Sequence, residues 1–99
     1  SLTIPNSVTS IGEYAFYYCD GFDGALTLSN SLKEIPKYCF FLCNSFNGNL
    51  IIPNTIEIIG NRAFKDCYSL TGNLVLGTSV KTIMSYAFDG CKFSYYIFL

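Results

Sequence analysis

The sequence predicts an α/β solenoid of about four right-handed coils, each with a short parallel β-strand and a short helical or 3₁₀ turn. Four stretches begin at leucines spaced 24 residues apart, namely Leu2, Leu26, Leu50 and Leu74. The same positions are apolar in every stretch, and a glycine closes each of the first three. One coil alone cannot bury such a face, whereas stacked coils share it as a continuous core.

The first element of each coil is a predicted strand. Leu2 and Ile4 are two residues apart, and the same pair recurs as Leu26 and Leu28, Leu50 and Ile52, and Leu74 and Leu76. This is the period of a strand with both side chains on one face. The residues between and beside them therefore face outward: Thr3, Thr27, Ile51 and Val75, flanked by Asn49 and Asn73.

Four more apolar columns follow in each coil. They are Val8, Leu32, Ile56 and Val80; Ile11, Ile35, Ile59 and Ile83; Phe16, Phe40, Phe64 and Phe88; and Cys19, Cys43, Cys67 and Cys91. The three-residue step from Phe to Cys suits one turn of α-helix or 3₁₀-helix. Gly24, Gly48 and Gly72 then permit a tight return into the next strand.

The chain forms one domain, residues 1–99, that begins and ends on a strand. Deleting one residue after Cys91 aligns Phe93 with the Phe22 column and places a fifth strand at 97–99, with Ile97 and Leu99 inward and Phe98 outward. Neither end has the polar cap that solenoids need. We expect a segment of a longer array. The alternative is a complete short protein that pairs end to end, and the uncapped ends favour self-association.

Residues 2–19 have the form Leu-x-Ile-Pro-x-x-Val-x-x-Ile-Gly-x-x-Ala-Phe-x-x-Cys, and residues 50–67 follow it closely. This motif resembles the BspA-like leucine-rich repeat of surface proteins in anaerobic bacteria and parasitic protists. The second coil departs from it at Ser29, Pro36 and Cys39. The resemblance implies a cell-surface or extracellular adhesin array that attaches to host proteins or cells, with no catalytic residues. A cytoplasmic location would instead favour an intracellular scaffold or ligand-sensing module.

Charge and composition argue against other classes of function. Six basic and seven acidic residues give a net charge of -1 with no basic patch, so we expect no nucleic-acid partner. The chain has no His, the commonest general base, and we expect no enzyme activity. The four aligned cysteines would form a line at about 4.8 Å per coil, which cannot surround one metal ion. We expect buried free thiols, no metal and no cofactor.

Two surfaces are candidates for binding a protein ligand. The first is the smooth, uncharged outward face of the strands: Thr3, Thr27, Ile51, Val75, Asn49 and Asn73. It is either a ligand face or an ordinary solvated sheet surface. The second is an aromatic patch: Tyr14, Tyr17, Tyr18, Tyr38 and Phe41. Exposed aromatic patches mark contact surfaces, unless the rings lie flat over the coil and shield the Phe column.

Overall fold

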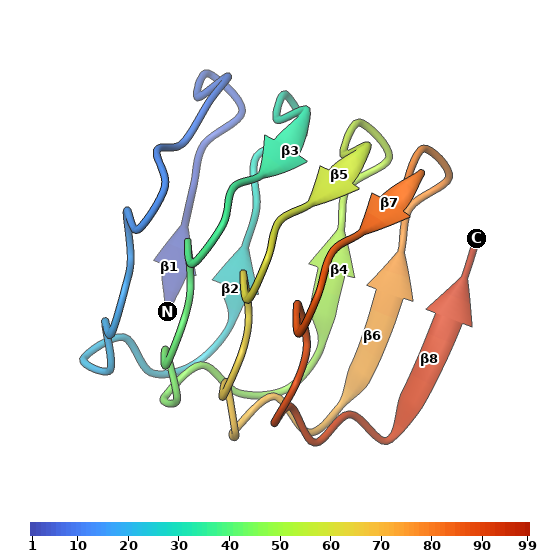
Figure 1. Cartoon of the computed structure of the whole chain (residues 1–99). Coiled ribbons are helices and arrows are strands. Elements are labelled where there is room, and N and C mark those ends of the chain that lie inside the picture. Colours follow the sequence, from blue (N-terminus) through green and yellow to red (C-terminus); the bar gives the residue numbers. More distant parts are fainter.

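The computed structural model describes all 99 residues as a parallel β-solenoid of about four coils (Figure 1). Every regular element is a short strand. The strands are β1 (Leu2–Thr3), β2 (Leu26–Thr27), β3 (Glu34–Ile35), β4 (Leu50–Ile52), β5 (Ile58–Ile59), β6 (Asn73–Leu76), β7 (Thr82–Ile83) and β8 (Tyr95–Phe98). The stacked-coil architecture predicted from the repeat is confirmed.

The first strand of each coil lies beside its equivalent in the next coil. Leu2 pairs with Leu26 and Leu50 pairs with Leu74, so the predicted 24-residue register holds along the first row of strands. This row consists of two parallel sheets, β1–β2 and β4–β6–β8. No strand pairing links β2 to β4, and the isolated bridge between Gly24 and Phe46 joins the first and second coils. The row therefore has a seam between β2 and β4.

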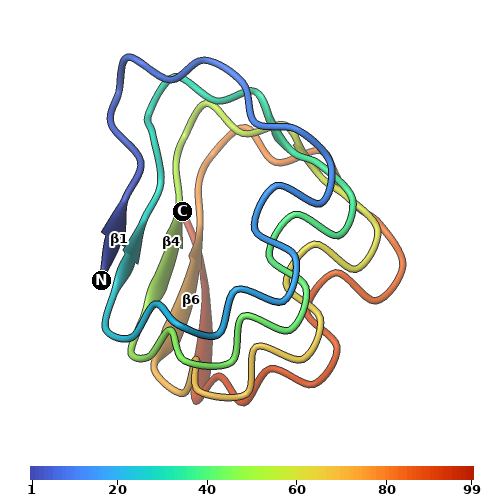
Figure 2. The ribbon, with the colours of Figure 1, turned by 90° about the vertical axis from the view of Figure 1, so that its left-hand side faces the viewer.

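A second row of strands, the parallel sheet β3–β5–β7, was not predicted, and we call it the second sheet (Figure 1). Figure 2 shows β1, β4 and β6 of the first row together along one side of the coils. The second sheet contains the isoleucine column, with Ile35 paired to Ile59 and Ile59 to Ile83. Each strand has two residues, which is too short for alternation to show in the sequence. The second, third and fourth coils consequently present two strand faces each, and Glu34, Ile58 and Thr82 point outward from the second face.

The segments from Phe to Cys are turns, so the predicted helical or 3₁₀ turns are not confirmed. In the first coil Tyr14 and Tyr18 have left-handed φ values of 62° and 59°. A left-handed residue interrupts a right-handed helix. Alternate N–H groups also leave the segment, since Phe16 N–H donates to the Cys39 carbonyl of the next coil at 2.9 Å. The backbone bonds that would extend a helix instead tie neighbouring coils together.

Two of the three glycines that precede a strand, Gly24 and Gly48, have the left-handed conformation that only glycine adopts freely. Their φ values are 79° and 78°. Gly72 is outside that region and does not depend on its conformational freedom.

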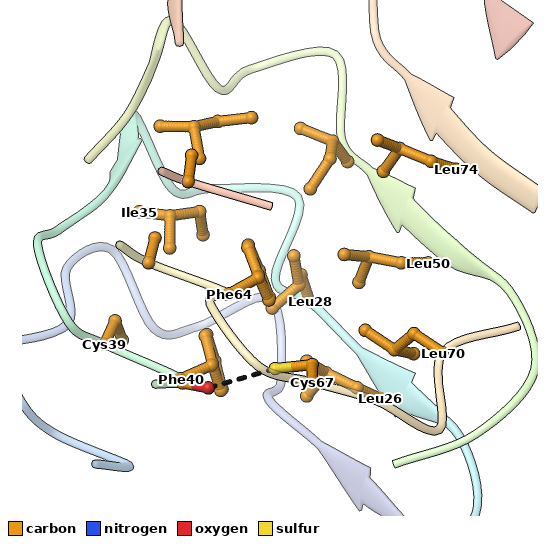
Figure 3. Packing of buried hydrophobic residues seen from close by; sticks show 14 of the residues in the cluster. Leu26, Leu28, Ile35, Cys39, Phe40, Leu50, Phe64, Cys67, Leu70 and Leu74 are labelled. Atoms are coloured by element: carbon orange, nitrogen blue, oxygen red, sulfur yellow. Dashed lines mark hydrogen bonds between the residues drawn. The ribbon is translucent and has the colours of Figure 1, made fainter. Parts of the chain in front are cut away.

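The core is a set of ladders that run along the stack. Ring centroids in the Phe column lie 5.1 Å apart from Phe16 to Phe40, 5.1 Å from Phe40 to Phe64 and 5.5 Å from Phe64 to Phe88, with nearly parallel planes. Figure 3 shows Phe40 and Phe64 among leucines from the first strand row. The buried hydrophobic cluster has 21 residues, and the central coils supply most of them. The predicted inward columns are confirmed there.

The predicted position of the last strand is wrong by one residue. Tyr96 pairs with Leu74 and Phe98 with Leu76, so Tyr96 and Phe98 continue the inward column while Ile97 lies beside outward Val75. Phe93 does occupy the expected column, with an edge contact to Phe88 at 6.1 Å that matches Phe16 with Phe22 at 6.4 Å. A second residue is missing after Phe93, where earlier coils have their glycine return. This deletion moves the strand to 95–98.

The two end faces of the chain leave apolar side chains in contact with solvent. Leu2, Val8 and Ile11 are half-buried at one end, and Ile83 and Phe98 are exposed at the other. The outer edges of β1 and β8 also lack a neighbouring strand. Unpaired edges and apolar patches drive association, and a head-to-tail contact of this kind does not close. We expect concentration-dependent oligomers of the 99-residue chain in light scattering. A clean monomer at high concentration would contradict this expectation.

Hydroxyl groups join neighbouring coils just after the first strands. The Ser29 hydroxyl donates to the Val8 carbonyl at 2.6 Å and accepts from the Ser31 N–H at 3.0 Å. The Ser31 hydroxyl donates to the Asn6 carbonyl at 2.6 Å. One coil further on, the buried Thr55 hydroxyl has no partner. Ser31 and Thr55 occupy the same position in successive coils, so this hydroxyl satisfies a backbone carbonyl in the second coil and fails to do so in the third.

This difference predicts opposite effects of two hydroxyl deletions. Thr55→Val keeps the side-chain shape and removes an unsatisfied buried group, which itself costs about 1–3 kcal/mol. We expect its free energy of unfolding in urea to rise by about 1 kcal/mol. Ser29→Ala, a hydroxyl deletion in a neighbouring column, leaves two backbone groups unpaired and should lower stability by about 1–3 kcal/mol. A loss of stability in Thr55→Val would mean that its hydroxyl has a partner.

Candidate protein-binding surfaces

The outward face of the first strand row is exposed and uncharged. Ile51 pairs with Val75, and Val75 with Ile97, so three β-branched apolar side chains lie in one row across β4, β6 and β8. Ile51 is 59% exposed and Ile97 is 39% exposed. Thr3 and Thr27 extend the same face over β1 and β2. We call these five residues the strand-row face. Ile97 occupies the outward position that was predicted for Phe98.

The asparagines beside this face have a structural role in the stack. The Asn49 side-chain oxygen accepts a hydrogen bond from the Asn73 N–H at 2.7 Å, which joins neighbouring coils. Asn49 also lines a shallow cleft of about 390 Å³ at the seam between β2 and β4. The cleft is lined by Ala25, Leu26, Thr27, Leu28, Asn47, Gly48, Asn49 and Ile51. The strand-row face thus has a recess beside its most exposed apolar side chain.

The aromatic patch forms two stacked pairs between the first and second coils. The rings of Tyr14 and Tyr38 are 4.9 Å apart and those of Tyr17 and Phe41 are 5.3 Å apart, both nearly parallel. Tyr18 is beside Tyr17 at 6.5 Å. Tyr14, Tyr17 and Tyr18 remain 47%, 45% and 59% exposed. All five residues meet in one patch, and its rings stack from coil to coil.

Charged side chains continue this surface over the third and fourth coils. The Arg62 guanidinium is 4.7 Å from the Tyr86 ring centroid and 5.8 Å from that of Tyr38, within cation–π range. Lys65 Nζ is 2.7 Å from the Asp89 carboxylate. The hydrogen bond to Asp89 raises the pKa of Lys65, and the carboxylates nearby keep it charged. The exposed aromatic side chains of this surface are therefore concentrated in the first two coils, with Tyr86 beside Arg62 in the fourth.

The cysteines are five free thiols. In the ladder the Cys43 thiol donates to the Phe16 carbonyl at 2.8 Å, and the Cys67 thiol donates to the Phe40 carbonyl at 3.1 Å, as Figure 3 shows for the latter. Cys43 and Cys67 are buried, while Cys19 and Cys91 in the end coils are half-buried. No group of three or more His, Cys, Asp or Glu side chains is placed to hold a metal ion. The sulfur atoms serve inter-coil packing.

Burial makes the central thiols poor nucleophiles. It raises the pKa of Cys39 to about 12 and that of Cys43 to about 11. The thiolate form attacks alkylating agents, so we expect few reactive thiols at pH 8 before unfolding and five in denaturant. Unfolded thiols ionise near pH 9, so stability should fall as the pH rises from about 9 toward 11. Denaturation at pH 8 and pH 11 measures this fall. Cys39→Ala, which restores the alanine of this column, should reduce it.

A groove beside the second sheet could not be predicted from the sequence, because the sheet itself was not predicted. The groove has a volume of about 560 Å³. It is lined by Ile11, Gly12, Glu13, Glu34, Pro36, Lys37, Ile58, Gly60, Asn61 and Met84. The only available signal was glycine directly after the isoleucine column, at Gly12 and Gly60, because a missing side chain on a coil surface leaves space.

Comparison with known proteins gives one match. Residues 1–99 match a family model described as "BspA type Leucine rich repeat region (6 copies)". No curated protein and no solved structure matches the chain significantly. The structure has no helix of the length and apolar character needed to cross a membrane.

Proposed function

The chain belongs to the BspA-type leucine-rich-repeat family, whose solenoids are typically protein-interaction modules, and from this premise we propose that it acts as part of a cell-surface adhesin. Its ligand is a protein on host cells or in their surroundings. The solenoid fold is typically a binding scaffold rather than a catalytic one. Attachment then depends on a surface that several coils build together.

The strand-row face is the surface that carries this proposal. Its supporting observation is the exposed apolar row of Ile51, Val75 and Ile97, which has no charged residue within it. Contiguous exposed apolar surface marks a contact site in soluble proteins, and charged residues are depleted at the centre of protein interfaces. The cleft at the seam beside Ile51 offers space for a side chain of the ligand.

Attachment of chain-coated beads to cultured epithelial cells tests this proposal. Ile51→Lys places a charge at the centre of the face, and we expect about tenfold weaker attachment, which corresponds to about 1.4 kcal/mol. Thr82→Lys is the matched control, since it adds the same charge at an exposed outward position of the second sheet. Circular dichroism verifies that both variants fold. Equal attachment by the wild type and Ile51→Lys, or no attachment by the wild type, would contradict the proposal.

A second candidate function is an intracellular scaffold, and the cysteines favour it. Five free thiols without a disulfide are the usual state in a reducing compartment. Labelling the full-length protein with an antibody on intact, unpermeabilised cells separates the two candidates. Surface labelling supports the adhesin, whereas labelling only after permeabilisation supports the scaffold.

A further inference from the structure

The groove beside the second sheet runs across several coils. Its floor is the column that follows the inward isoleucines: Gly12, Pro36, Gly60 and Met84, one residue from each coil. A Cβ at Gly12 would meet nothing within 4 Å, so the groove is open at this point. Gly60 brings its backbone against the coil before it, with its N–H donating to the Ile35 carbonyl at 2.7 Å. The floor is therefore main chain at Gly12 and Gly60.

The groove has one apolar and acidic wall. This wall is the outward row of the second sheet, where Glu34 pairs with Ile58 across neighbouring strands. Ile58 is 39% exposed although it lies in a central coil, and Met84 is exposed beside the same groove. A ligand side chain placed here would bury apolar surface of both residues.

The charges of the groove are unbalanced. Its charged lining residues are Glu13, Glu34 and Lys37, which leave one net negative charge. Lys37 Nζ lies 4.0 Å from the Glu13 carboxylate, so these two already face each other. Glu34 has no basic group within 4.0 Å. The uncompensated charge is consequently that of Glu34, next to exposed Ile58.

The dimensions fit a short extended segment. Neighbouring strands lie about 4.8 Å apart, so the distance from the first to the fourth coil is about 14 Å, and an extended chain rises about 3.3 Å per residue. About four to five residues would cover the groove. Such a segment can place a cationic side chain at Glu34 and an apolar one over Ile58 and Met84.

We infer that this groove binds an extended peptide segment in which a Lys or Arg stands beside an apolar residue. The cation forms a charge-assisted bond with Glu34, and the apolar side chain covers Ile58. This site lies on a different sheet from the strand-row face. It goes beyond the proposed adhesion function and does not depend on it.

Fluorescence anisotropy with two labelled peptides tests the inference on the full chain. The probes are fluorescein-Ser-Val-Lys-Val-Ser and the same peptide with Glu in place of Lys. We expect saturable binding of the Lys peptide, at least about tenfold weaker binding of the Glu peptide, and weaker binding at high salt. No binding of the Lys peptide at millimolar concentration, or equal binding of both peptides, would overturn it.

Two variants test whether the peptide binds in the groove. Glu34→Gln should weaken the Lys peptide about tenfold, whereas Glu57→Gln, which removes a carboxylate paired with Lys81 at 3.3 Å outside the groove, should leave it unchanged. Gly12→Phe fills the groove at a position where the fold has space, and it should abolish binding. Unchanged affinity in Glu34→Gln or in Gly12→Phe would contradict the assignment. Loss of binding in Ile51→Lys instead would assign the peptide to the strand-row face.

Discussion

Replacing Phe64 by alanine is expected to unfold the chain or to lower its free energy of unfolding by about 3–5 kcal/mol, the usual cost of a core Phe→Ala change. The Phe64 side chain is fully buried and stacks between Phe40 at 5.1 Å and Phe88 at 5.5 Å. Its removal leaves a cavity in the centre of the ladder. A domain of this size has a total stability of about 5–15 kcal/mol, so urea denaturation should show a large shift or no folded baseline.

Two controls separate the ladder from a general sensitivity to aromatic loss. Phe16→Ala removes the same ring from the first coil, where Phe16 is half-buried and has one neighbour in the column, Phe40. It should cost clearly less than Phe64→Ala. Tyr86→Asn changes an exposed residue at φ 60°, a conformation that Asn tolerates, and should cost about 1 kcal/mol at most. If Tyr86→Asn were the most damaging of the three, the inward phase would be off by one residue and the binding surfaces would have to be withdrawn.

Gly60→Ala is expected to lower the free energy of unfolding by about 3 kcal/mol, at the upper end of what overpacking costs. A Cβ at this position would lie 2.6 Å from Lys37 N, 2.7 Å from Pro36 C and 2.9 Å from Ile35 O. These are backbone atoms of the preceding coil, so a side-chain rotation cannot relieve the contact. The two coils would have to separate, which weakens the second sheet between β3 and β5. Urea denaturation measures the loss.

The same substitution two coils earlier in the stack should have the opposite effect on stability. Gly12 begins the same column in the first coil, and a Cβ there would meet nothing within 4 Å. Its φ lies outside the left-handed region, so alanine fits the conformation. Gly12→Ala should therefore raise stability by about 0.4–1 kcal/mol, because it restricts the unfolded chain. Similar effects at Gly12 and Gly60 would contradict the close stacking of coils at the second sheet.

The stacking of coils and the composition of the core could be predicted because the signal repeats. A single pair such as Leu50 and Ile52 fits several structures, but its recurrence at the same spacing in four coils fits one arrangement. The inward phase of the strand row and the Phe column followed from this recurrence, and both are confirmed in the central coils. The free Cys ladder followed from the same geometry.

Other features could not be predicted because they depend on contacts between coils. The second sheet consists of two-residue strands that form only when Ile35 and Ile59 lie side by side. The turns from Phe to Cys adopt left-handed φ at residues such as Tyr18 and Leu42, which have no local preference for it, because their N–H groups bond to the next coil. The last strand was misplaced because deletions in the fourth coil are visible only through the pairing of Tyr96 with Leu74.

The candidate surfaces also include some that the repeat predicts and one that depends on contacts between coils. Four of the five residues of the strand-row face, and all five of the aromatic patch, could be listed from column positions. Ile97 could not, because the last strand was misplaced. The groove that contains Glu34 and Ile58 could not be found in this way, since it requires the second sheet and the close approach of Gly60 to the preceding coil.

Nuclear Overhauser effects between residues 24 positions apart test the stacked-coil architecture most directly. The stacked coils predict cross-peaks between the ring protons of Phe40 and Phe64, whose centroids are 5.1 Å apart, and between the side chains of Ile35 and Ile59 in the second sheet. A chain that carries isotope labels only at Phe and Ile would resolve these cross-peaks. If these cross-peaks were absent, and the contacts of Phe64 were instead with residues three or four positions away in a helix, the solenoid would be wrong.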